Sequence, residues 1–264
     1  MGYFEALILG AIQGLTEFLP VSSSGHLELG AHFLGVKDSN NLLFAIIVHA
    51  ATALSTIVVF RKDIWVIIKD LLAFQWNEST QFTAKIALSM IPVGIIGVLF
   101  EDQINEIFSG SVIFVASMLA VTGLLLLLTH YAKPQTGSVT FSKSLIIGIA
   151  QAIAILPGIS RSGSTISTAL LLGVDRAKAA RFSFLMVLPP ILGAALLKLL
   201  EFIKAPASAV DMAYGPIIVG FLAAFLSGLI ACTWMIDLVK KGKLVYFAIY
   251  CFAIAGVVIL ITLL

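Results

Sequence analysis

Three ionisable residues lie in the two polar interruptions of an otherwise apolar chain. Glu17 and His26 belong to GLTEFLPVSSSGHLELG (Gly14–Gly30), and Arg161 belongs to LPGISRSGSTIST (Leu156–Thr168). An ionisable side chain inside a membrane segment is costly and indicates a functional site. A guanidinium offers a planar fork to phosphate oxygens, while a carboxylate and an imidazole can carry protons near hydroxyl groups. This set of side chains is suited to the hydrolysis of a phosphoanhydride.

Both segments also have a backbone pattern that suits an anion. Each breaks an apolar helix at a proline and opens another helix with a turn of serine and glycine. A serine N-cap pairs free backbone N–H groups, and the N-terminus of a helix favours a negative charge. We therefore predict that two facing turns cradle a phosphate, with substrate contacts from Ser22, Ser24, Gly25, Ser162 and Gly163.

Simpler explanations exist for each residue taken alone. Serine and glycine pack membrane helices closely. Glu17 and Arg161 would also serve as a buried ion pair between two parts of the fold, and His26 would serve as a helix cap. None of these explanations accounts for the whole set, because one charged pair suffices for structure.

The composition indicates what surrounds these segments. The chain has 264 residues, of which 60% are hydrophobic and 11% charged, and its mean hydropathy is +1.09. A soluble domain carries about 25% charged residues, so most of this chain faces lipid. The net charge of +2 and the lack of a basic cluster argue against nucleic acid as a partner.

A helix that crosses a bilayer core of about 30 Å needs about 20 apolar residues. Two apolar stretches, Tyr3–Leu19 and Leu145–Leu156, are too short and run into Pro, Gly and Ser, so we predict that they re-enter the membrane without crossing it. The fold class is therefore an all-α polytopic membrane protein. Its six predicted spans are Leu42–Phe60, Phe82–Phe100, Val112–His130, Phe182–Leu200, Pro216–Ile236 and Leu244–Leu264.

The chain also repeats itself at a spacing of 138 residues. LILGAIQ matches LIIGIAQ, SSSG matches SRSG, and eleven of the thirty positions from Leu7 to Val36 are identical to their counterparts. We predict one membrane domain, residues 1–264, made of two repeats, about 1–131 and 139–264. Each repeat has one re-entrant helix-turn-helix segment and three spanning helices.

Basic residues favour the cytoplasmic side of a membrane. They follow the first span, occupy the linker Ala132–Lys143, precede the fourth span and separate the last two, whereas the loop with Glu101, Asp102 and Glu106 has none. Placing the basic loops inside and the acidic loop outside gives the two repeats opposite orientations in the membrane. Their re-entrant segments then meet near the middle of the membrane.

The segments GLTEFLPVSSSGH and PGISRSGST closely resemble the two signature motifs of the undecaprenyl-diphosphate phosphatases of the bacitracin-resistance type. Length, span pattern and duplication agree, so the resemblance covers the whole chain. It implies hydrolysis of undecaprenyl diphosphate to the monophosphate carrier lipid, in support of peptidoglycan synthesis and bacitracin resistance. It also implies a divalent cation, Mg²⁺ or Ca²⁺, and an active site open to the outer side of a bacterial plasma (inner) membrane.

The resemblance also implies roles for single residues. Glu17, His26 and Arg161 match the family's essential acidic residue, histidine and arginine. Ser23 matches the serine proposed as nucleophile, so the expected catalytic set is Glu17, Ser23, His26 and Arg161. Ser160 and Thr165 match hydroxyls that contact the diphosphate.

The sequence departs from the family pattern at Gln13, where some members have a second glutamate. Glu17 is then the expected metal ligand, and Gln13 is expected to offer an oxygen to the substrate or the metal. A metal site that needs two carboxylates is placed in doubt by this departure.

Several alternatives stay open at this stage. Attack on phosphorus by Ser23, by His26 or by an activated water all fit the residues. A lipid-phosphate transporter or flippase is the rival class, because inverted repeats with broken helices are typical of carriers. The partners we expect are an isoprenoid diphosphate and the bilayer, and a homodimer is compatible with the sequence.

Overall fold

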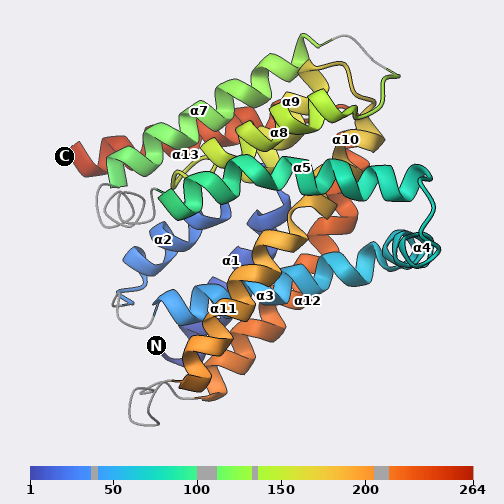
Figure 1. Ribbon diagram of the computed structural model, residues 1–264. Coiled ribbons are helices and arrows are strands. Elements are labelled where there is room, and N and C mark those ends of the chain that lie inside the picture. The colour runs from blue at the N-terminus through green and yellow to red at the C-terminus, as the bar shows by residue number, and fades with distance from the viewer. Residues whose placement is uncertain (37–40, 100–111, 133–135, 205–213, 264) are drawn as a thin grey trace.

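The computed structural model describes residues 1–36, 41–99, 112–132, 136–204 and 214–263. Within these ranges the regular structure is helical, and the one β contact is an isolated bridge between Gly137 and Val174. The predicted outer loop with Glu101, Asp102 and Glu106 lies outside the described residues, as does Lys133. The helices, labelled in Figure 1, are α1 (Tyr3–Phe18), α2 (Ser23–Phe33), α3 (Asn41–Val59), α4 (Arg61–Leu72), α5 (Glu78–Leu99), α7 (Val112–His130), α8 (Phe141–Ile153), α9 (Arg161–Leu171), α10 (Arg176–Met186), α11 (Leu188–Lys204), α12 (Tyr214–Lys240) and α13 (Val245–Leu263).

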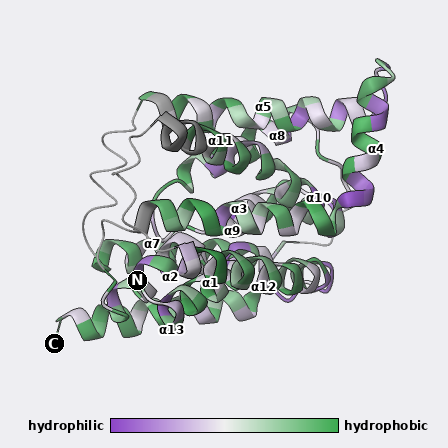
Figure 2. Cartoon of the chain, turned by 90° about the horizontal axis from the view of Figure 1, so that it is seen from below, coloured by the Kyte–Doolittle hydropathy of each residue, from purple (hydrophilic) through white to green (hydrophobic). Residues whose placement is uncertain are grey.

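The described helices confirm an all-α, multi-pass membrane protein. Five stretches are long and apolar enough to cross a membrane, namely α5, α7, α12, α13 and the α10–α11 stretch, and the number is six if the bent pair of α3 and α4 counts as one span. Figure 2 shows hydrophobic residues along the outside of the long helices. Their exposed apolar side chains, such as Leu226, Ile230 and Leu260, have lipid as their natural surroundings.

The fourth predicted span, Phe182–Leu200, differs from the structure in its start and its continuity. It is built from α10 and α11, with a break at Val187, and the spanning stretch runs over Arg176–Leu197. The break has a local cause, because Pro189 and Pro190 lie in the first turn of α11. Proline lacks a backbone N–H and is tolerated there but not inside a continuous helix.

Helix α4 was not predicted. It bends away from α3 by 79° and buries none of its residues. Trp65 on this helix is exposed, as are the basic residues Arg61, Lys62 and Lys69. Figure 2 shows α4, with its hydrophilic residues, at one end of the molecule. Tryptophan and basic residues are enriched where a membrane meets water. We therefore interpret α4 as an interfacial helix.

The short helices α1 and α8 are held by close contact with long helices. A Cβ on Gly10 of α1 would lie 2.3 Å from the Gly220 carbonyl of α12. At the matching position of α8, a Cβ on Gly148 would lie 2.4 Å from the Ser89 carbonyl of α5. Gly10 and Gly148 are 138 residues apart, so the sequence repeat recurs in the packing. The inverted orientation of the two repeats stays a prediction.

Candidate active site

The two serine-rich turns have the same capping geometry. Ser22 is the N-cap of α2 and its Oγ accepts from the Gly25 N–H at 3.3 Å, while Ser160 is the N-cap of α9 and its Oγ accepts from the Gly163 N–H at 3.0 Å. The first two residues of a helix have no intrahelical partner for their N–H groups. These residues are Ser23 and Ser24 in α2, and Arg161 and Ser162 in α9. The capping serines therefore take structural roles, and the next residue in each turn faces the site.

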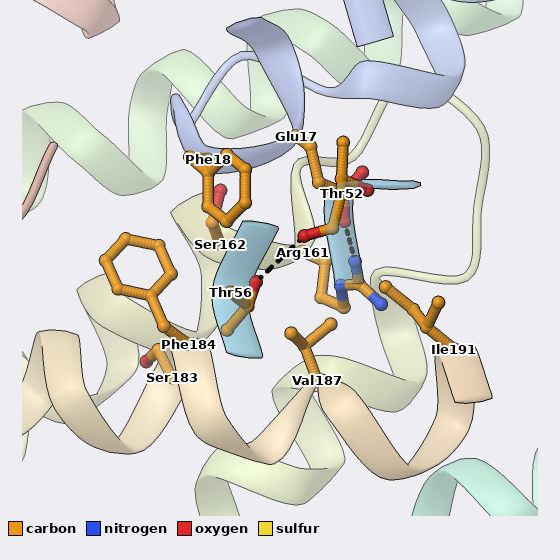
Figure 3. Close-up of a pocket in the computed structure, with 10 residues that line it drawn as sticks. All are labelled: Glu17, Phe18, Thr52, Thr56, Arg161, Ser162, Ser183, Phe184, Val187 and Ile191. Atoms are coloured by element: carbon orange, nitrogen blue, oxygen red, sulfur yellow. Dashed lines mark hydrogen bonds and ion pairs between the residues drawn. The ribbon is translucent and has the colours of Figure 1, made fainter. Parts of the chain in front are cut away.

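Glu17, near the end of α1, is the hub of the site. Its Oε2 accepts from Ser23 Oγ at 2.7 Å and from Gln13 Nε2 at 2.8 Å, and His49 Nε2 lies 3.7 Å away. Its Oε1 forms an ion pair with Nη2 of Arg161, which Figure 3 shows as a dashed line. The Glu17 side chain is 5% exposed and that of Arg161 is 27% exposed. A buried carboxylate is thus paired on one oxygen and receives a hydroxyl proton donor on the other.

A cavity of about 400 Å³ opens beside this hub. Its polar wall is formed by Ser23, Ser24, His49, Gln151 and Arg161, and a volume of this size accommodates a small-molecule headgroup. The rest of the wall is apolar and comes from α3, α5, α11, the turn after α8 and the turn before α9. These apolar residues are Ala45, Ile46, Val93, Ala154, Ile155, Ile159, Pro190, Ile191 and Ala195.

His26 is not among the residues that line this cavity. Its Nδ1 lies 2.8 Å from the Ser22 carbonyl, which can only accept, so Nδ1 carries the proton. Its Nε2 lies 2.8 Å from the hydroxyl of Tyr250 on α13, and the two rings stack. Ser22 has a φ of 68°, an uncommon value outside glycine. The His26 contact therefore holds a strained turn that orients the neighbouring Ser23.

Four residues that were predicted to contact the substrate make packing or capping contacts within the protein. A Cβ on Gly25 would meet Val115 and the turn before α9, and one on Gly163 would meet Ser160 and Thr122. The Thr165 hydroxyl donates to the Arg161 carbonyl at 2.9 Å, within its own helix. None of Gly25, Ser160, Gly163 and Thr165 lines the 400 Å³ cavity. Their packing and capping contacts explain why these residue types are needed without a direct ligand contact.

The ion pair also lines a second cavity, of about 10 Å³, whose lining residues Figure 3 shows. It is the size of one water molecule. Ser162, Ser183, Thr52 and Thr56 line it together with Glu17 and Arg161. The Ser162 hydroxyl lies 3.3 Å from the Leu19 carbonyl, whereas the buried hydroxyl of Ser183 has no hydrogen-bond partner among the described residues.

Sequence reasoning missed three residues of the site. His49 lies outside both serine-rich motifs and was not among the predicted site residues, but its Nδ1 donates to the Ala45 carbonyl at 2.7 Å and its Nε2 faces Glu17. Tyr250 lies in a uniformly apolar span and gave no signal. Gln151 matches Gln13 in the repeat, and that match is the sequence signal that would have identified it.

The oxygen atoms around Glu17 define what metal the site fits. The described residues contain no cluster of three His, Cys, Asp or Glu side chains able to hold an ion. Glu17 provides one carboxylate, and the buried Oε1 of Gln13 has no hydrogen-bond partner among the described residues. Magnesium ions commonly bind through one or two protein oxygens plus substrate phosphates and water. These atoms fit a cation that shares its ligands with a diphosphate.

Comparison with known proteins identifies the family of this chain. The family model "Bacitracin resistance protein BacA" matches residues 6–258. An undecaprenyl-diphosphatase of Bacteroides fragilis is 54% identical over 262 residues, which cover 99% of this chain and 98% of the relative. One of Christiangramia forsetii is 56% identical over 256 residues, with 96% of each chain covered, and one of Salinibacter ruber is 41% identical over 268 residues, covering 97% and 98%. This chain belongs to the bacitracin resistance protein BacA family.

Proposed function

We infer that this protein is an undecaprenyl-diphosphatase, which hydrolyses undecaprenyl diphosphate to undecaprenyl phosphate and inorganic phosphate. The names of its relatives, at 41–56% identity over nearly the whole chain, support this activity. The reaction recycles the lipid carrier for peptidoglycan synthesis, and the family name supports a role in bacitracin resistance. The observation that carries the inference is the hydroxyl of Ser23 donating to Glu17 beside Arg161, at the wall of a cavity large enough for a headgroup.

In the mechanism that we propose, Ser23 is the nucleophile. Its Oγ proton passes to Glu17 Oε2, 2.7 Å away, as Oγ attacks the terminal phosphorus. The bond between that phosphorus and the bridging oxygen breaks, and the lipid monophosphate leaves with the bridging oxygen. Water then attacks the phosphoserine, inorganic phosphate leaves, and the proton on Glu17 returns to Ser23.

Arg161 is the proposed clamp for the transferred phosphoryl group. It lines the cavity, and its guanidinium has further N–H groups besides the one paired with Glu17. The N-terminus of α2, with Ser23 and Ser24 at the cavity wall, adds the helix dipole to the same anion site.

His26 is better suited to positioning than to attack on phosphorus. Both of its ring nitrogens have partners, Ser22 and Tyr250, and it does not line the cavity. We propose that it fixes the turn that carries Ser23. Direct attack by water stays the competing route, since Glu17 is able to accept a proton from either group.

We further propose that a divalent cation, Mg²⁺ or Ca²⁺, binds together with the diphosphate. Glu17 and the free Oε1 of Gln13 are the protein oxygens that would hold it. When bound, the cation offsets the negative charge of the diphosphate.

The lipid tail and the location complete the proposal. The apolar wall of the cavity, from α5, α11 and the turn after α8, suits the isoprenoid chain. We propose that the protein lies in the bacterial inner membrane with its site open to the periplasmic side. A homodimer stays a prediction.

Phosphate release from undecaprenyl diphosphate by the purified protein tests the function and separates an enzyme from a transporter. Ser23→Ala should lose activity by about 10⁴-fold or more while retaining substrate binding, because its nucleophile is gone. Ser24→Ala is the matched control and should lose far less, since Ser24 shares the turn but lacks the bond to Glu17. Acid-stable phosphoserine trapped in a rapid quench would support Ser23. Acid-labile phosphohistidine, or full activity of Ser23→Ala, would refute it.

A further inference from the structure

Gln151 has a buried amide group that the fold leaves unpaired. It lies on α8 and is 2% exposed, and its Oε1 has no hydrogen-bond partner among the described residues. The nearest acceptor for its Nε2 is the sulfur of Met90 at 3.8 Å, which is a weak acceptor. A buried polar group without a partner destabilises a fold, so each one calls for an explanation. A ligand that completes the pairing is one such explanation.

Comparison with Gln13 shows that the two glutamines share an unpaired Oε1 but differ in the partner of their amide nitrogen. The two residues occupy matching positions of the repeat, on α1 and α8. Gln13 donates to Glu17, four residues further along its helix. Four residues after Gln151 the chain has Ile155, so the same helical contact offers no polar partner. The amide of Gln151 therefore has no strong polar partner within its own helix.

The position of Gln151 on the cavity wall indicates where its amide could bind a ligand. Gln151 lines the 400 Å³ cavity with Arg161 and Ser23, but it comes from a different helix than either of them. The cavity residues that follow it in the chain, just beyond the end of α8, are the apolar Ala154 and Ile155. Gln151 is thus a polar cavity residue next to apolar ones, a setting that suits the point where a headgroup joins a hydrocarbon chain.

We propose that Gln151 binds the phosphate that stays on the lipid, through hydrogen bonds from its amide nitrogen. This inference rests on the proposed function, in which Ser23 and Arg161 hold the terminal phosphate. A diphosphate held there has its second phosphate one bridging oxygen away, on the side of the prenyl chain. A neutral amide suits this phosphate, because its nitrogen donates to phosphate oxygens while its oxygen accepts from a water or a protonated phosphate oxygen.

Inhibition by the two reaction products tests separately the binding of the lipid-linked phosphate and of the terminal phosphate. The variant Gln151→Met keeps the length of the side chain and removes its polar atoms. Its KM for farnesyl diphosphate and its Ki for farnesyl monophosphate should both rise about tenfold or more, the scale of one hydrogen bond to a charged group. Its Ki for inorganic phosphate should stay unchanged, because that product binds at Arg161. The ligand-free variant should also melt at the same temperature or higher, since an unpaired buried amide has been removed.

Gln81→Met, on α5 and outside the cavity, is the matched control and should change none of these values. Unchanged inhibition by farnesyl monophosphate in Gln151→Met would overturn the proposal, and so would an equal rise in the Ki for inorganic phosphate. If Gln151→Met does not fold, Gln151→Leu repeats the test, and failure of both to fold would assign Gln151 a structural role instead. If the wild-type protein releases no phosphate from either prenyl diphosphate, the proposed function itself fails.

Discussion

Replacing Arg161 tests the centre of the proposed site. Arg161→Lys keeps a positive charge that can pair with Glu17, but it loses the planar fork that binds phosphate oxygens in pairs. Because the contact is made to the group undergoing reaction, we expect kcat/KM to fall by about 10²–10³-fold, the scale of losing one transition-state contact. The melting temperature should change little, since the buried carboxylate keeps its counter-charge.

Arg161→Gln changes stability as well. Removing one partner of a buried ion pair costs about 3–5 kcal/mol, because the other charge is left uncompensated. The Glu17 side chain is 5% exposed but that of Arg161 is 27% exposed, which favours the lower end of this range. A loss of about 3 kcal/mol corresponds to a decrease of about 6–12 °C in melting temperature for a chain of this size. The double variant Glu17→Gln with Arg161→Gln should recover much of this stability and none of the activity.

The measurements are thermal melts in detergent and phosphate release from undecaprenyl diphosphate, on the same preparations. Arg61→Gln is the matched control, because Arg61 is exposed on α4 and donates to the Val58 carbonyl. Near-normal turnover of Arg161→Lys would mean that Arg161 supplies only diffuse charge. A melt of Arg161→Gln equal to that of the control would show that the ion pair does not stabilise the site.

Three further predictions follow from the same contacts. Gln13→Glu adds a carboxylate beside the proposed metal, so activity should persist while a metal titration after chelation should shift to lower concentration; an unchanged titration would assign Gln13 to packing. Tyr250→Phe removes the donor to Nε2 of His26, so kcat should fall about tenfold or less while the melting temperature stays near normal; unchanged kcat would mean that His26 is held without it. A topology reporter after Lys133 should lie in the cytoplasm and one after Glu106 outside, because basic residues favour the inner side, and finding both on one side would refute the inverted repeats.

Local features of the site were predictable from the sequence because they depend on neighbours in the chain. The serine at the start of each turn, Ser22 or Ser160, was expected as an N-cap and takes that role. The repeat spacing of 138 residues correctly aligns α2 with α9 at both ends, Ser23 with Arg161 and Phe33 with Leu171. The spans were predictable for a similar reason, since crossing lipid requires about 20 apolar residues in one run.

Only the tertiary structure decided which side chains meet. Arg161 pairs with Glu17 across 144 residues of chain, and His26 contacts Tyr250 across 224 residues. The sequence prediction included His26 in the site and left His49 out, because only His26 lies in a serine-rich motif. Helix crossings instead point His49 at Glu17 and turn His26 towards α13. Periodicity and turn residues determine the local hydrogen bonds of a helix. The approach of side chains on separate helices depends instead on close contacts between helices, such as Gly10 against Gly220. Such a contact needs residues from two distant segments, so neither segment alone encodes it.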